Sequence, residues 1–142
     1  MRHPLQSVAE NDAELLRGAT LHDAAWALAD FALGFSNGTW VHVFVSDAAV
    51  RWRLHDAQPL LRHEPQFRVG APPIDLDWKG TIGVHTMDVS ELVAKRIDAE
   101  FAGLCANHTG FFVYFRGHLV LQFHAAYRTD NGRDLLYVDE GE

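Results

Sequence analysis

The chain has 142 residues and a net charge of −7, and 48% of its residues are hydrophobic and 11% aromatic. This length suits one domain with a buried core, and the apolar content is too high for a disordered chain. The acidic balance argues against nucleic acid or an anionic membrane as a partner, because both need Lys and Arg opposite them. A basic protein partner is compatible with this charge.

The first seventy residues predict a short helix followed by paired strands. Residues 5–17 place apolar side chains near helical spacing, and Gly18 is a suitable stop. Residues 31–35 alternate as a strand does and lead into Asn37-Gly38, which predicts a type I′ hairpin turn because both residues tolerate positive φ. Alternation then predicts a return strand at 40–45 and a further strand at 50–54.

The second half begins after a break at residues 69–73, where Pro72 and Pro73 forbid a helix or a central strand. Asp88 to Glu91 is a suitable helix start, and the helix is expected to be short because the residues after it alternate. The predicted strands of this half span residues 96–101, 111–115, 119–123 and 135–138, with turns at 107–110, 116–117 and 129–132.

The two halves have similar patterns. The alternation before Asn37-Gly38 recurs before Arg116-Gly117, and upstream we align residues 18–21 with residues 94–97. A duplication would explain this, and so would two hairpins that obey the same physics. We predict a mainly β (α+β) fold, with two packed curved antiparallel sheets or a β-sandwich built from two similar β-meander halves, plus short N-terminal and mid-chain helices. Residues 1–142 then form a single domain, with halves of about 1–68 and 74–142 joined by the linker 69–73.

No motif for metal binding is present. Structural zinc needs closely spaced Cys or His pairs, and the nine histidines provide none. His118 and His124 would share a strand face about 20 Å apart, too far for one ion. A site built from distant histidines such as His42, His85 and His124 stays open, but we expect no metal and no cofactor.

The search for catalytic motifs gives the same result. His22-Asp23 and His55-Asp56 are sequence neighbours, and neighbours on a strand point to opposite faces. No Gly-x-Ser-x-Gly motif of a serine hydrolase occurs. The single cysteine, Cys105, is expected to be a structural thiol, and with it no internal disulfide can form. We therefore expect no catalytic residues.

Location follows from what the sequence lacks. The first residues contain no apolar h-region, and no segment approaches the roughly 18 apolar residues of a membrane span. A lone cysteine suits a reducing compartment. We expect a cytoplasmic protein, monomeric or weakly dimeric.

Charge suggests where a partner would bind. Residues 1–70 contain eight acidic and six basic residues, whereas residues 71–142 contain eleven acidic and six basic ones. Trp78 lies beside Asp75 and Asp77, and an aromatic anchor ringed by acids is a reasonable interface centre, although Trp78 as a core residue is an equal alternative. The expected partner-binding residues are Asp75, Asp77, Trp78, Asp98, Glu100, Asp139 and Glu140.

A family resemblance supports this hypothesis. The run Leu16-x-Gly18-x-x-Leu21, the alternation that ends in Asn37-Gly38 and the ending Asp134–Glu140 resemble small acidic bacterial immunity proteins of contact-dependent inhibition and other polymorphic toxin systems. The resemblance is to an outline over most of the chain, and it carries over no interface residue. It implies a non-catalytic protein that binds and neutralises a cognate toxin domain, basic and of the nuclease type.

The alternative is a small-molecule-binding or hydratase-like domain with an aromatic pocket. A closed apolar pocket containing a buried acid–base pair would favour this function, whereas a flat acidic surface would favour the inhibitor. The residues expected to line such a pocket are Trp26, Trp40, Trp52, His42 and Asp47.

Overall fold

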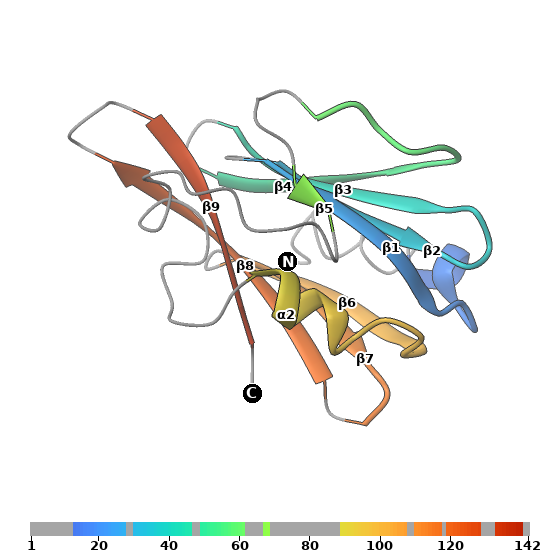
Figure 1. Ribbon diagram of the computed structural model, residues 1–142. Coiled ribbons are helices and arrows are strands. Elements are labelled where there is room, and N and C mark those ends of the chain that lie inside the picture. Colours follow the sequence, from blue (N-terminus) through green and yellow to red (C-terminus); the bar gives the residue numbers. More distant parts are fainter. Residues whose placement is uncertain are drawn as a thin grey trace, which may run out of the picture.

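The computed structural model describes residues 13–27, 30–46, 49–61, 67–68, 89–107, 110–117, 119–128 and 133–140 (Figure 1). Two antiparallel sheets form it, a five-stranded sheet in the order β4-β3-β2-β1-β5 and a four-stranded sheet in the order β6-β7-β8-β9. The predicted mainly β, two-sheet fold is confirmed. The strands are β1 (Leu21–Trp26), β2 (Asp30–Phe35), β3 (Trp40–Ser46), β4 (Ala49–His55), β5 (Phe67–Arg68), β6 (Phe101–Asn107), β7 (Gly110–Phe115), β8 (Leu119–Arg128) and β9 (Arg133–Glu140), and the helix α2 is Val89–Ala94.

The hairpin between β2 and β3 forms where Asn37-Gly38 predicts it, but its turn is not type I′. Phe35 N donates to Thr39 O at 2.9 Å and Gly38 N donates to Phe35 O at 3.0 Å, which closes a three-residue loop. Only its third residue needs a positive φ, and Gly38 supplies it at 87°. Asn37 acts through its side chain instead. Its Oδ1 accepts from Thr39 N, and its Nδ2 donates to Leu15 O in the helical turn 13–16.

The segment after α2 corrects one prediction. Residues 96–101 were expected to form a strand, yet residues 95–98 form turns and β6 begins only at Phe101. Arg96 is fully buried, because its guanidinium donates to Leu92 O at 2.9 Å and to Val120 O at 3.2 Å. These two carbonyls offset part of the cost of burying its N–H groups, so Arg96 does not face solvent as the alternation implied, whereas Asp98 does.

An approximate two-fold relation joins the two sheets. Leu21 N donates to Ala99 O at 3.0 Å, and Phe101 N donates to Ala19 O at 2.8 Å. Adding 80 to the numbers of Leu21 and Ala19 gives Phe101 and Ala99, so the two bonds are equivalent. An isolated bridge between Thr20 and Glu100 lies between them. The register bulges match as well, since β1 is irregular after Leu21 and β6 after Phe101. Leu21 therefore corresponds to Phe101, and the alignment of residues 18–21 with 94–97 was wrong by four positions.

The core lies between the two sheets and contains residues from both halves. Trp52 of β4 stacks on Phe111 of β7 with ring centroids 4.7 Å apart, and Phe31 of β2 meets Phe123 of β8 edge to face at 5.3 Å. Each fully buried aromatic or aliphatic side chain contributes about 1.5–3 kcal/mol. α2 packs against β9 at one end of the second sheet (Figure 1). None of the described helices is long and apolar enough to cross a membrane.

Candidate functional site

The expected partner-binding residues are only partly brought together. Asp75, Asp77 and Trp78 lie outside the described residues. Asp98 is exposed in the turn before β6, with a φ of 69°. Glu100 forms an ion pair, in which its Oε2 lies 2.7 Å from Arg116 Nε. This partner offsets the charge that Glu100 was expected to present.

One end of the second sheet carries acidic residues. Asp98 and Glu100 precede β6 there, and β9 ends towards it with Glu140, which pairs with Leu121. Asp139 lies further along the sheet, in one row with Gln122, Phe112 and Cys105. β6 and β9 are the two edge strands, so their acids are at least three strand spacings apart, about 14 Å or more. The result is a broad acidic end and not a compact acidic cluster.

The outer face of the second sheet carries aromatic side chains that sequence analysis did not single out. Phe112 and Tyr114 alternate with the core residues of β7 and are stacked, with ring centroids 6.3 Å apart. His124 of β8 meets Phe112 edge to face at 6.5 Å. All three are half-buried. We call this surface the outer aromatic face, and it comprises Cys105, Phe112, Tyr114, Gln122, His124 and Asp139, with Gln122 and Asp139 opposite each other on β8 and β9.

Tyr114 keeps its proton at physiological pH. Burial raises the pKa of its phenol, and the neighbouring Cys105 raises it further because two negative charges would repel each other. The neutral phenol offers both a hydrogen-bond donor and an apolar ring. Side chains of this kind are common at protein interfaces.

The outer face of the first sheet contains an acid–base pair. His42 Nε2 lies 2.7 Å from Asp30 Oδ2, and the two residues are 8% and 0% exposed. They are diagonal neighbours on β3 and β2, because Ala32 pairs with His42 and Asp30 with Phe44. Sequence analysis considered only adjacent His-Asp pairs and missed this one. The apolar alternation at 31–35 and 41–45 would have placed both residues on the face opposite the core, whereas the predicted two-residue turn shifts the register by one and separates them.

Basic and aromatic side chains surround His42. The His55 ring lies 5.8 Å from the His42 ring, and the Arg53 guanidinium lies 5.4 Å from the centroid of Phe44. Burial lowers the pKa of His55, and the charges of His42 and Arg53 lower it further, while Asp56 opposes this shift. The Nε2 atom of His55 is buried without a hydrogen-bond partner, so a proton there would be poorly stabilised.

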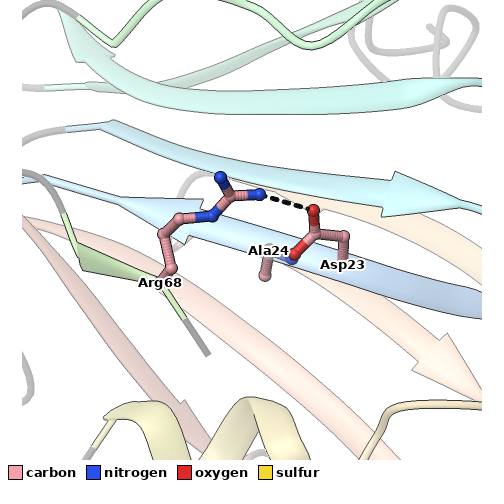
Figure 2. Close-up of polar contacts among 3 residues, drawn as sticks. All are labelled: Asp23, Ala24 and Arg68. Atoms are coloured by element: carbon pink, nitrogen blue, oxygen red, sulfur yellow. Dashed lines mark hydrogen bonds and ion pairs between the residues drawn. The ribbon is translucent and has the colours of Figure 1, made fainter. Parts of the chain in front are cut away.

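The outer face of the first sheet also carries a close contact between an aromatic ring and a glycine, and an ion pair between β1 and β5. The Trp40 indole lies over Gly34, where a Cβ would be only 2.7 Å from the ring. Arg68 Nη2 donates to Asp23 Oδ2 at 2.9 Å, and Asp23 Oδ1 accepts from Ala24 N at 2.8 Å, which fastens β5 to β1 (Figure 2). Asp23 therefore pairs with Arg68 and not with the exposed His22 beside it.

The residues of the predicted aromatic pocket do not share a cavity. Trp26 stacks on Phe31 and Trp52 on Phe111, both in the core, whereas Trp40 and His42 lie on the opposite face of the sheet. Asp47 lies outside the described residues. The prediction of this pocket is therefore wrong, because the alternation of the strands places these side chains on opposite faces of the first sheet.

Within the described ranges, no group of three His, Cys, Asp or Glu side chains is placed to hold a metal ion. His42 lies on the outer face of the first sheet and His124 on the outer face of the second, with the core between them. His85 lies outside the described residues. Comparisons of the chain with protein-family models, with curated proteins and with solved structures found no match.

Proposed function

We propose that this chain is a non-catalytic binding protein of the immunity type, and that its outer aromatic face contacts a basic, nuclease-type toxin domain. The observation that supports this proposal is the stacked, half-exposed pair Phe112 and Tyr114, with Asp139 in the same face. The solvent face of a half-buried antiparallel sheet is ordinarily polar. Rigid aromatic side chains there are typical of interface centres, where they bury large areas at low entropic cost.

The two-fold relation makes this face distinctive. The positions that correspond to Phe112 and Tyr114 in the first sheet are Ala32 and Gly34, and Ala32 is fully buried while Gly34 lies beneath Trp40. The scaffold therefore does not require large rings at these positions. The rings on the outer face of the first sheet come from β3 instead, as Trp40 and Phe44. The position of the rings on β7 is therefore particular to the second sheet, which supports a role in recognition.

Charge supports a basic partner. Asp98 is exposed at the acidic end of this sheet, and Asp139 lies on the aromatic face itself. Carboxylates here would attract the Lys and Arg that a nuclease uses to contact phosphates, and binding them would block its substrate. Phe112 and Tyr114 would then supply most of the affinity, and the acids most of the association rate.

The test pairs two double variants. Phe112→Ser with Tyr114→Ser should weaken binding to the toxin encoded by the neighbouring gene by at least about tenfold, as expected for interface anchors. Arg51→Ser with Arg53→Ser, on β4 of the other sheet, should leave binding unchanged. Binding is measured by titration calorimetry, together with survival of cells that express the toxin. The proposal fails if the wild type neither binds nor protects.

A second function has one observation in its favour. The buried pair of Asp30 and His42 has no ionic counterpart in the second sheet, where the corresponding residues are Gly110 and Gln122, so the scaffold does not need it. A small-molecule-binding domain would use such a pair to orient a polar ligand. Native mass spectrometry of protein purified from its source would then show a bound small molecule that His42→Gln loses. Wild-type protein without one would exclude this alternative.

A further inference from the structure

The four edge strands of the two sheets differ in how they are protected. β4 carries Arg51 and Arg53, and β5 has only two residues, one of which is Arg68. β9 contains charged residues at both ends. β6, with the sequence Phe-Ala-Gly-Leu-Cys-Ala-Asn, has no charged residue and no proline. Proteins ordinarily guard exposed edges with charges, prolines or short strands, so β6 is the one edge here without side-chain protection.

Few of the described residues pair with the outer side of β6. Its inner side pairs with β7 from Phe101 to Asn107. On its outer side, Phe101 N donates to Ala19 O, and beyond that bond no described residue pairs with β6. In an antiparallel ladder every second residue points its N–H and C=O away from the paired neighbour. Ala102 is exposed, and Gly103, Leu104 and Cys105 are half-exposed, so these backbone groups are accessible.

We propose that β6 pairs in antiparallel orientation with β6 of a second copy of this chain, which joins two four-stranded sheets into one of eight strands. The strand is complementary to itself, because an uncharged edge meets an identical uncharged edge and no charge is desolvated. Antiparallel pairing places the two Glu100 residues at opposite ends of the interface, where each keeps its own Arg116 partner. Each copy has one such edge, so the assembly closes as a two-fold dimer and does not grow into a fibre.

The dimer should be weak and salt-dependent. One short strand pair buries less than the roughly 800 Å² per partner of a standard stable interface. Each copy carries a net charge of −7, so long-range repulsion opposes association until salt screens it. The dimer is therefore expected to form more completely at about 1 M salt than at about 0.1 M. This pairing leaves the outer aromatic face exposed, and so it does not depend on the proposed function.

Two matched variants test the edge. Ala102→Lys adds a charge to the exposed position of β6, and Ala94→Lys adds the same charge to an exposed position of α2. Sedimentation velocity over a concentration series should show a monomer–dimer equilibrium for the wild type and for Ala94→Lys, and only monomer for Ala102→Lys. Circular dichroism confirms that both variants are folded. A monomer at every concentration overturns the proposal, as does a dimer that Ala102→Lys leaves intact.

Cys105 provides an independent probe, since the chain has one cysteine. Paired residues must face the same side of the sheet, so the self-pairing centres on Leu104 or on Cys105. The two Cys105 residues then lie diagonally, about 7–8 Å apart, or directly opposite at about 5 Å. A short bis-maleimide should join two wild-type chains at Cys105. The control is Cys105→Ser with Lys95→Cys, which moves the thiol to an exposed site directly after α2. Equal cross-linking of the two proteins would contradict pairing through β6.

Discussion

Leu21 and Phe101 hold equivalent positions at the start of β1 and β6, and each donates its N–H to the residue two positions before the other, Ala99 for Leu21 and Ala19 for Phe101. Both are buried, at 0% and 6% exposure. This reciprocal contact joins the two sheets at one corner through backbone bonds. The corner therefore aligns the two meanders so that their alternating apolar faces meet in one core.

The β2–β3 turn depends on one glycine. Gly38→Val should lower the free energy of unfolding by at least about 1 kcal/mol, because a β-branched residue resists the φ of 87° found there. Gly38→Asn is the control, since asparagine tolerates this conformation better. Denaturant unfolding followed by tryptophan fluorescence measures both. Equal midpoints for the valine variant and the wild type would show that this turn does not limit stability.

Arg96 should contribute to stability as a buried residue and not as a surface charge. Arg96→Ala leaves the carbonyls of Leu92 and Val120 without this donor and creates a cavity, so a loss of about 3 kcal/mol or more is expected. Arg96→Leu copies Leu16, which holds the equivalent position and is fully buried, and it should recover part of the loss. Thermal unfolding by calorimetry checks both. A loss below about 0.5 kcal/mol for Arg96→Ala would match a surface residue instead.

The sequence could predict some strands of this fold but not β1 or the burial of Arg96. The strand at 111–115 was predictable because one of its faces is fully buried, which imposes strict alternation. The strand at 31–35 is buried on both faces, and it was predictable because large core residues alternate with the small Ala32 and Gly34. β1 was not, because the irregularity after Leu21 breaks its alternation. Arg96 resembles a solvent-facing residue, and its burial depends on the carbonyl of Val120, which only the tertiary fold brings near.

The candidate site escaped sequence analysis for a different reason. The uneven charge along the sequence predicted an interface wherever acidic residues were frequent. Glu100, however, is paired with Arg116 within the chain. Asp30 and His42 are twelve positions apart and meet only through the register of the hairpin. Phe112 and Tyr114 looked like ordinary members of an apolar strand. Their half-exposure depends on which face of the sheet the rest of the chain leaves open.

His55 should make stability depend on pH below neutrality. Its pKa is lowered in the folded state, so the unfolded chain binds this proton more tightly. The contribution of neutral His55 is fully present above its ordinary pKa of about 6.5 and declines as the pH falls from there towards the lowered folded value. His55→Gln should therefore flatten the fall in melting temperature between about pH 7 and 5. An unchanged slope would show that His55 does not set the acid sensitivity.

The last prediction separates charge from contact at the proposed toxin interface. Asp98→Asn removes a charge but keeps a residue that tolerates the φ of 69° at this position, so the turn should fold normally. Because Asp98 is exposed at the acidic end, its loss should slow association and flatten the salt dependence, with little change in dissociation. Tyr114→Ser should speed dissociation and change association little, since a half-buried anchor mainly sets the dissociation rate. Glu100→Gln should have a smaller effect than Asp98→Asn, because Arg116 already offsets that charge. Surface plasmon resonance against the neighbouring toxin domain at two salt concentrations measures both rates. If Asp98→Asn and Tyr114→Ser change the same rate to the same extent, or if neither changes any rate, the toxin does not bind the outer aromatic face beside this acidic end.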